Sequence, residues 1–383
     1  MLNIGVLTSL LYFETKEVQG RDKIIFGGAE RYLYELCKLL QEDGHDVTVF
    51  QSLNQNTDTG WINVNKHVAK NFRGIPVVCL SNTDRQWQMS TNPYMNMVYN
   101  EIATNMDLSI FFVTFLCYPY TPVNSISISH GVYWDSTHHF VATARPKEKE
   151  EWLRRNLVGF TEPDVCVAVD SNVRKAVAAL SPGAEKRIQI IYNFVDTKKF
   201  TPKEKDWEGI NVLFPRRLTA IRGCNEFIKA SQQYREYRYI SVGQATVDSM
   251  NESAKEYGNE RGNIEFLHKE MDGMEEVYQS ADIAVVPTVA CEGLSLSLLE
   301  AMSCGLPVIT TPVGGLGDAI IPGYNALLYD PHHGGLGELI HYMAQDEDMR
   351  KRFGERNRQI ATECFDIEIW KERWRQLIKG FGD

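Results

Sequence analysis

The sequence has no excess of basic residues. Its 383 residues include 40 Lys and Arg against 50 Asp and Glu, which gives a formal net charge of -10. Binding to the phosphate backbone of a nucleic acid depends on massed Lys and Arg, so this balance argues against a general nucleic-acid binder. An anionic ligand must instead be bound by a few local cations.

Paired cysteines and long apolar runs are also missing. The eight cysteines include no C-x-x-C pair, so neither a zinc site nor a disulfide framework is indicated. No apolar run reaches the ~18 residues that a membrane span needs. The start, MLNIGVLTSLLYF, has no positive residues before its apolar run and predicts a strand rather than a signal peptide. We expect reduced thiols, a cytoplasmic location and no transmembrane segment, with peripheral membrane contact left open.

Two ligand-binding signatures are absent as well. No G-x-G-x-x-G follows the first predicted strand, which argues against a nicotinamide enzyme. No Asp-x-Asp pair stands in a loop after a predicted strand, where a metal-dependent site would place it. We therefore expect no metal and no cofactor.

Short β-branched runs alternate with helical patterns along the chain, which is typical of βαβ units in a parallel sheet. In residues 30–50 a stripe of leucines predicts a helix that ends at Gly44, and Val47 and Val49 predict the next strand. The other predicted strands lie within residues 3–7, 108–115, 124–131, 165–170, 187–195, 211–215, 237–243, 263–268, 283–288 and 307–311.

These units predict an α/β protein of two doubly wound parallel-sheet domains with a cleft between them. Residues 1–195 form the first domain, the charged stretch 196–209 is a linker, and residues 210–360 form the second. Residues 361–383 predict an amphipathic helix that packs back across the body. Ligands of such sheets bind beyond the carboxyl ends of the strands, so functional residues are expected just after strands.

Two glutamates stand eight positions apart in CEGLSLSLLEAMSCG, residues 291–305. Glu292 precedes a predicted helix that ends at Gly305, and Glu300 lies inside it. Free amides at the helix start, about Leu294 to Ser297, suit a phosphate, and the carboxylates suit hydroxyls. Together they predict a sugar-nucleotide site. The spacing alone fits equally well a helix-capping residue and a solvent-exposed helix position.

Several segments, in the right order, resemble the retaining glycosyltransferases of family 4. EGLSLSLLEAMSCGLPVITT is similar to their E-x7-E signature, and FGGAERYLYELCKLLQEDGHDVTVF to their Gly-Gly loop, helix and GH-x-V strand. NFVDTKKFTP resembles N-G-V-D…F-x-P, with Phe194 where glycine is usual, and FPRRLTAIRGCNEFIKA resembles G-R-L…K-G. The resemblance covers nearly all of the chain and implies the GT-B fold, in which two Rossmann-like domains face a deep cleft.

For the donor, the resemblance implies roles residue by residue. Arg217 falls on the family's arginine and Arg222 on its lysine, so both would bind the donor diphosphate and stabilise its developing charge. Glu292 would hold the sugar hydroxyls and Glu300 the ribose, and His268 would lie beside the base. The expected donor-binding residues are Gly27, Gly28, Asn193, His268, Gly293, Leu294, Ser295 and Glu300.

The first domain offers weaker candidates. His130 ends a predicted strand and resembles the family's strand-terminal histidine near the donor sugar, with a structural role as the alternative. Tyr133 and Trp134 follow it and are expected near the acceptor, although such aromatics can equally pack in a core. The pair at 27–28 opens a helix whose backbone can approach a ligand closely. The polar stretch 12–25 before it predicts a loop on the acceptor side.

The sequence therefore indicates a metal-independent retaining glycosyltransferase with Glu292, Arg217, Arg222 and His130 as catalytic residues. It would move a hexose from a nucleoside-diphosphate sugar, such as a UDP- or GDP-sugar, to a hydroxyl of a glycan, lipid-linked or small-molecule acceptor. Two alternatives stay open: a sugar-nucleotide epimerase on the same fold, and a non-catalytic protein that binds a sugar nucleotide. The sequence does not identify the base, the sugar or the acceptor.

Overall fold

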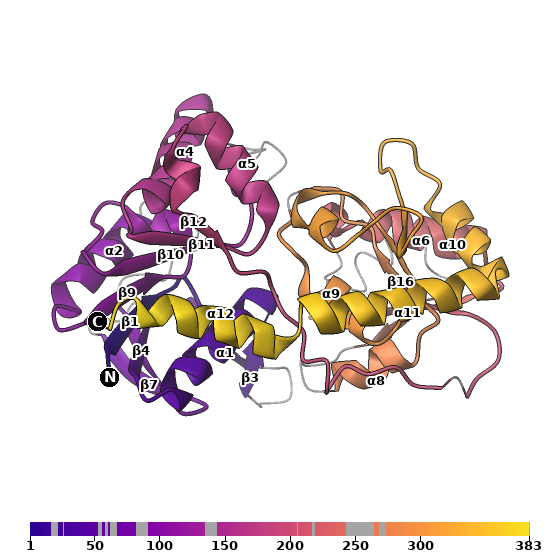
Figure 1. The fold of residues 1–383 in the computed structure, drawn as a ribbon, viewed down its shortest axis with the longest axis horizontal. Helices are drawn as coiled ribbons and strands as arrows, with labels where there is room; N and C mark the ends of the chain where they lie inside the picture. The colour runs from indigo at the N-terminus through magenta and orange to yellow at the C-terminus, as the bar shows by residue number, and fades with distance from the viewer. Residues whose placement is uncertain are drawn as a thin grey trace. The chain divides into compact units, whose positions relative to one another are not determined.

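The structure is a computed structural model, drawn as a ribbon in Figure 1. It describes residues 1–16, 22–25, 27–52, 56–57, 60–61, 67–81, 91–134, 144–204, 206–216, 219–242, 264–267, 273–290 and 292–382. The chain divides into two compact units. The first comprises Met1–Ile191 and Lys371–Asp383, and the second comprises Tyr192–Trp370.

The first unit is built on an eight-stranded sheet in the order β12-β11-β10-β9-β1-β4-β8-β7. All neighbouring strands in it are parallel except β7 and β8. Its strands are β1 (Asn3–Leu7), β4 (Asp46–Ser52), β7 (Val68–Phe72), β8 (Ile75–Leu80), β9 (Leu108–Phe111), β10 (Ser125–Ser129), β11 (Val165–Ala168) and β12 (Ile188–Ile190). The helical segments are α1 (Gly28–Glu42), α2 (Thr91–Ile102), η1 (Thr114–Cys117), α4 (Pro146–Thr161), α5 (Ser171–Leu180) and η2 (Ala184–Arg187).

Two short hairpins accompany this sheet. β2 (Phe13–Lys16) pairs antiparallel with β3 (Asp22–Ile25), and β5 (Asn56–Thr57) pairs with β6 (Gly60–Trp61). The prediction of a loop over residues 12–25 was therefore wrong for β2 and β3. Backbone pairing forms these strands, and their mixed polar sequence carries no long apolar run that would indicate it.

Helix α1 follows the predicted pattern. Leu33, Leu36, Leu39 and Leu40 are all buried, which confirms the leucine stripe. Gly44, just beyond the helix, has a φ of 85°, a left-handed conformation that glycine adopts without steric cost. Helix α1 therefore packs on the sheet through one face and ends where the sequence predicts.

The second unit is built on an all-parallel six-stranded sheet in the order β15-β14-β13-β16-β17-β18. Its strands are β13 (Asn211–Phe214), β14 (Arg238–Val242), β15 (Ile264–Leu267), β16 (Ile283–Val286), β17 (Val308–Thr310) and β18 (Ala326–Leu328). The helical segments are η3 (Ala220–Arg222), α6 (Cys224–Gln233), α8 (Met274–Gln279), α9 (Leu296–Ser303), η4 (Gly314–Asp318), α10 (Leu336–Gln345) and α11 (Glu347–Cys364). The last helix, α12 (Ile367–Lys379), begins in this unit and ends in the first.

Helices cover both faces of the second sheet (Figure 1). Successive strand residues enter different core clusters, as Val212 packs with residues of α6 and α10 while Leu213 packs with residues of α8 and α9. Because side chains alternate across a strand, a strand buried on both faces must be apolar throughout. This explains the continuous apolar runs that mark the strands in the sequence.

The stretch 196–209, predicted as a linker, belongs to the second unit. Phe200 is fully buried in its core, and the Phe200 carbonyl accepts hydrogen bonds from the side chains of Ser303 and Arg358.

At the other end of the chain, the later turns of α12 pack on the first unit. The indole of Trp374 donates to the hydroxyl of Tyr32 at 3.0 Å.

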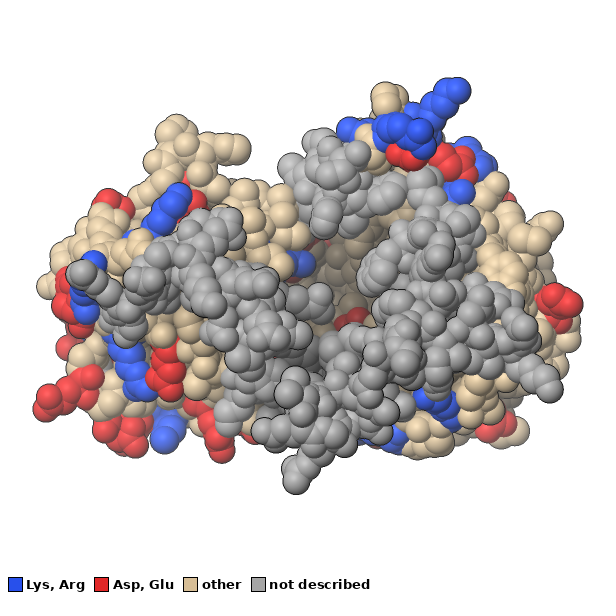
Figure 2. All heavy atoms as spheres, turned by 180° about the vertical axis from the view of Figure 1, so that it is seen from behind, with Lys and Arg blue, Asp and Glu red and all other residues tan. Residues whose placement is uncertain are grey.

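The described cysteines and helices can be compared with the expectations drawn from composition. Each described cysteine is a free thiol, and all of these are buried except Cys364. Among the described helices, none has the length and apolarity to cross a membrane. Figure 2 shows acidic and basic side chains intermixed on the described surface in view.

His130 lies directly after β10, between two aromatic rings of the first unit. Its ring is 5.2 Å from that of Tyr32 and 4.5 Å from that of Phe112. Its Nε2 atom is buried and has no hydrogen-bond partner among the described residues. Burial lowers the pKa of His130 to about 4, against an opposing hydrogen bond to the backbone of Phe112. The imidazole is therefore neutral at physiological pH.

Because His130 is buried and neutral, the stability of the protein should depend on pH. The substitution His130→Gln should make this pH dependence weaker. The folded-state pKa of about 4 lies below the ordinary 6.5, so between these values the unfolded chain binds a proton that the folded protein does not. The free energy of unfolding should therefore fall as the pH decreases, by about 2 kcal/mol between pH 7 and pH 5 from this group. Urea unfolding at the two pH values measures the loss.

The exposed His332 provides the matched control, since His332→Gln should keep the parent's loss. An equal loss in His130→Gln and in the parent protein would contradict the assignment.

Candidate functional site

The strand order of the second sheet reverses between β13 and β16. The chain runs outward from β13 through β14 to β15, then crosses to the other side of β13 and continues outward through β16, β17 and β18. At such a switch point the loops after the two central strands diverge, and ligands of doubly wound sheets bind there. The segments after β13 and β16 hold the predicted diphosphate-binding arginines and half of the expected donor-binding residues.

A glycine brings Arg222 close to the loop after β16. Gly223, between η3 and α6, has a φ of 82°, and a Cβ at this position would lie 2.2 Å from the carbonyl oxygen of Pro287. The amide of Val289 also donates to the carbonyl of Ile221 at 3.0 Å. Only glycine permits this backbone approach, which places the arginine at the switch point.

Glu292 is held through its backbone by a second glycine turn. The amide of Gly315 donates to the Glu292 carbonyl at 3.0 Å. Gly314 has a φ of 57°, and a Cβ there would lie 1.9 Å from the same carbonyl oxygen. The backbone of Glu292 is therefore held by η4, more than 20 residues later in the sequence, as well as by its own loop.

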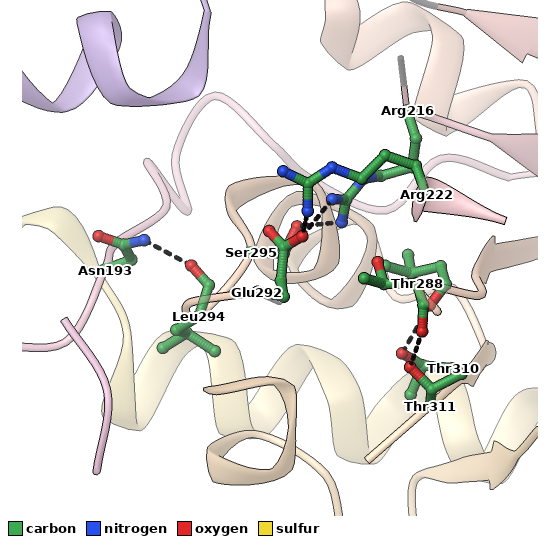
Figure 3. A network of polar contacts seen from close by, with 10 residues as sticks. Asn193, Arg216, Arg222, Thr288, Glu292, Leu294, Ser295, Thr310 and Thr311 are labelled. Carbon is green, nitrogen blue, oxygen red and sulfur yellow. Dashed lines mark hydrogen bonds and ion pairs between the residues drawn. The ribbon is translucent and has the colours of Figure 1, made fainter. Parts of the chain in front are cut away.

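Two arginines converge on the Glu292 carboxylate (Figure 3). Arg216, which follows β13, donates from Nη2 to Glu292 Oε2 at 2.6 Å and from Nη1 to Ser295 Oγ at 2.8 Å. Arg222 forms an ion pair with the same carboxylate oxygen. The side chains of Arg216, Glu292 and Arg222 are 6%, 11% and 27% exposed. We call these three residues the Arg-Glu-Arg cluster.

The cluster carries a net positive charge. Burial lowers the pKa of Arg216 to about 10, which leaves the guanidinium charged at neutral pH. The Glu292 carboxylate in contact with it favours the charged form further. Two cations and one anion in a poorly solvated place suit an anionic ligand such as a phosphate. No group of described acidic, histidine and cysteine side chains is arranged to hold a metal ion.

Ser295 is the N-cap residue of α9, but its side chain does not cap the helix. The sequence left two roles open for this hydroxyl, as a phosphate donor or a helix cap. In the structure it accepts from Arg216 instead, so it positions the buried guanidinium. The first amides of α9 consequently have no capping side chain from this residue.

Other predicted residues line the same region. The amide nitrogen of Asn193 donates to the Leu294 carbonyl at 2.5 Å, while its Oδ1 is buried without a partner among the described residues. The hydroxyl of Thr288, two residues after β16 and not among the predicted residues, is likewise buried and unpartnered in the described part of the chain. The Thr288 carbonyl is held by the Thr311 hydroxyl at 2.7 Å. The Leu294 side chain is buried in the core, so only its backbone is available to a ligand.

Glu300 is buried inside α9 rather than exposed on the helix. Its residue exposure is 7%, and its Oε2 accepts from the hydroxyl of Tyr278 at 2.7 Å. Burial, followed by the Glu300 charge, raises the pKa of Tyr278 well above its usual range, so the phenol stays protonated and donates. The solvent-exposed helix position that the spacing allowed is excluded for this glutamate.

The structure therefore brings Arg222, Glu292 and Ser295 together. Arg217 and His268 lie outside the described residues, so their predicted roles stay predictions. Sequence reasoning missed Arg216, which stands at the glycine position of the G-R-L pattern. Its place directly after a strand could have indicated it, because it shares that feature with its neighbour Arg217.

The candidates of the first unit gather beyond the carboxyl ends of its strands. Gly27 precedes α1, and its amide donates to the Glu30 carboxylate at 2.9 Å, while Gly28 is exposed in the first turn. Tyr32, one turn later, contacts the His130 ring.

Tyr133 and Trp134, the two predicted acceptor residues, are both half-buried. The Tyr133 carbonyl accepts from the Trp152 indole at 3.0 Å, and the Trp134 ring lies 5.4 Å from that of Phe160. These contacts give both residues a packing role, and contact with an acceptor stays a prediction.

Solved structures of similar fold cover nearly the whole chain. A sucrose-phosphate synthase from Thermosynechococcus elongatus has a TM-score of 0.78 at 17% identity and covers 99% of each chain. Anabaena HepE, solved in complex with UDP and glucose, has a TM-score of 0.74 at 17% identity and covers 99% of this chain and 100% of that one. At this identity the likeness is one of fold, the two-domain GT-B fold.

Curated relatives are more similar over shorter lengths. D-inositol 3-phosphate glycosyltransferase from Paenarthrobacter aurescens is 31% identical over 219 residues, or 51% of this chain and 53% of the relative. An uncharacterized glycosyltransferase from Methanocaldococcus jannaschii is 28% identical over 57% of this chain and 58% of the relative. The chain thus spans little more than half the length of these two relatives.

Two protein families match consecutive parts of the chain. Residues 26–199 match the family described as Glycosyltransferase Family 4, and residues 195–360 match the family described as Glycosyl transferases group 1. Together the two matches extend from residue 26 to residue 360, so both parts of the chain are similar to glycosyltransferase domains.

Proposed function

We propose that this glycosyltransferase is a retaining hexosyltransferase that uses a nucleoside-diphosphate sugar and needs no metal ion. The Arg-Glu-Arg cluster at the ends of β13 and β16 carries the proposal, because it places a net positive charge beside a carboxylate. HepE, with a similar fold, was solved in complexes with UDP and glucose and with UDP-glucose, which supports a donor of this class.

The donor diphosphate is proposed to lie against Arg222 and the amides from Leu294 to Ser297 at the start of α9. When the bond between the anomeric carbon and the phosphate oxygen breaks, negative charge develops on the β-phosphate. Preorganised cations and helix-terminal amides in a poorly solvated site stabilise that charge. Arg217 is proposed to act beside Arg222, as the family's motif implies.

The two glutamates are proposed to bind the hydroxyls on either side of the diphosphate. Glu292 accepts from the hexose hydroxyls, and Glu300 accepts from the ribose. Tyr278 supports the second role, because it occupies one carboxylate oxygen of Glu300 with a 2.7 Å hydrogen bond and so fixes the orientation of the other.

The acceptor is a hydroxyl of a glycan, a lipid-linked sugar or a small molecule. In the front-face course that the family resemblance implies, its oxygen bonds to the anomeric carbon on the face from which the diphosphate departs. The acceptor proton passes to the leaving phosphate oxygen, and the products are the glycosylated acceptor and a nucleoside diphosphate. We also propose a cytoplasmic location, which the buried free thiols of the described chain support.

Transfer with retention is the first test of the function. Incubated with a panel of UDP- and GDP-sugars and with glycan acceptors, the protein should yield a glycoside with the anomeric configuration of the donor. The coupling constant of the anomeric proton in the NMR spectrum of the product measures that configuration. An inverted product would contradict retention. An altered nucleotide sugar without acceptor would indicate an epimerase, and binding without turnover would indicate a non-catalytic protein.

Metal independence is a separate expectation. Because arginines and helix amides neutralise the diphosphate in this proposal, turnover should be largely unchanged by excess EDTA. Initial rates with and without EDTA check this. Loss of activity that Mn²⁺ or Mg²⁺ restores would show that a metal bridges the diphosphate.

Glu300→Ala should weaken nucleotide binding. Removing a carboxylate that accepts charged hydrogen bonds from both ribose hydroxyls costs roughly 1.5–3 kcal/mol. Calorimetry with the nucleoside diphosphate alone measures the change in Kd. Tyr278→Phe, which removes only the hydrogen bond that orients Glu300, should cause a smaller loss.

Glu347, which pairs with Lys351 and is 68% exposed, gives the matched control. Its alanine variant should bind the nucleotide like the parent protein. Parent-like affinity in Glu300→Ala as well would refute the ribose role.

A further inference from the structure

Arg216 and Arg222 contact the same carboxylate oxygen from different environments. Arg216 is 6% exposed and comes from the segment directly after β13, while Arg222 is 27% exposed and comes from η3. Arg216 is also held by Ser295, the N-cap residue of α9, so two elements fix its guanidinium. The two arginines therefore differ in solvent exposure and in the elements that hold them, although both pair with Glu292.

Glu292 needs a permanent positive partner. Its side chain is only 11% exposed, and a carboxylate in so little water stays ionised only beside a cation. If Arg222 were its sole partner, moving Arg222 to a phosphate would leave the buried carboxylate unpaired. With Arg216 in place, Glu292 remains neutralised when Arg222 takes another anion.

We propose that Arg216 is the resident counter-ion of Glu292 and thereby frees Arg222 to bind the donor diphosphate. The inference rests on the proposed function, in which a nucleotide sugar is the ligand. Arg216 is then a positioning residue: it keeps Glu292 charged and oriented through Oε2, while the diphosphate is bound by the more exposed arginine. Figure 3 shows the two guanidinium groups meeting on one side of the carboxylate.

The alternative is that Arg216 binds the diphosphate directly. The two roles predict different effects of neutralising Glu292. A counter-ion is needed only while the carboxylate is charged, so its loss should be suppressed by Glu292→Gln. A direct phosphate ligand is needed whatever residue stands at position 292.

The experiment measures the Kd for UDP and GDP by calorimetry in the parent protein, Arg216→Met, Glu292→Gln and the double variant. In Arg216→Met, Arg222 becomes the sole charged partner of Glu292 among the described residues, and the affinity for the nucleoside diphosphate should fall about tenfold. In the double variant the affinity should return to within about threefold of that of Glu292→Gln, a non-additivity expected of residues in contact. Arg238→Met, which removes an exposed arginine paired with Glu265, should bind like the parent.

A tenfold loss on adding Arg216→Met to Glu292→Gln would overturn the proposal, because it would make Arg216 a phosphate ligand. An unchanged affinity in folded Arg216→Met would overturn it as well. If Arg216→Met does not fold, the comparison between Glu292→Gln and the double variant still decides, since neither contains the unpaired carboxylate. Failure of the parent to bind any nucleoside diphosphate would refute the proposed function instead.

Discussion

A buried carboxylate that must remain charged is the constraint on which the candidate site depends. Glu292 has little access to water, and its two arginine partners come from segments far from it in the sequence. Removing a partner from a buried ion pair costs much more than the pair contributes, because the remaining charge stays desolvated. The loops after β13 and β16 are therefore coupled through this group.

Close backbone contacts keep those loops at the required distance. Gly223 lets η3 approach the end of β16, and Gly314 lets η4 hold the Glu292 carbonyl. Both have positive φ, and a side chain at either position would collide with backbone atoms. Their contribution is to bring charged side chains of different elements together.

The two glutamates of the site share a physical arrangement. Each is mostly buried, and each has one carboxylate oxygen held by a buried donor from another element, Arg216 for Glu292 and Tyr278 for Glu300. Glu292 and Glu300 are thus both positioned by side chains of neighbouring elements. Such support restricts the orientation of a carboxylate before a ligand arrives, which reduces the entropy lost on binding.

Much of the fold could be predicted from local patterns. Continuous apolar runs indicated the central strands of both sheets, and the leucine stripe and Gly44 indicated the extent of α1. The strands of the β2–β3 hairpin could not be recognised in this way, because their pairing rests on backbone hydrogen bonds between mixed polar residues. The stretch 196–209 was predicted to be a linker because it is charged and has no apolar period. Its single anchoring residue, the fully buried Phe200, does not form such a pattern.

The sequence by itself indicated where the candidate site lies and which kinds of side chain it contains, because a glutamate pair around a helix start and basic residues after a strand are local features. It did not determine that Arg216 and Arg222 both contact Glu292. That contact depends on the packing of β13 against β16, which brings the segments after the two strands together. It also could not link Tyr278 with Glu300 or Ser295 with Arg216, which are 22 and 79 positions apart. Such contacts depend on how strands and helices pack, and tertiary structure alone brings these side chains within hydrogen-bonding distance.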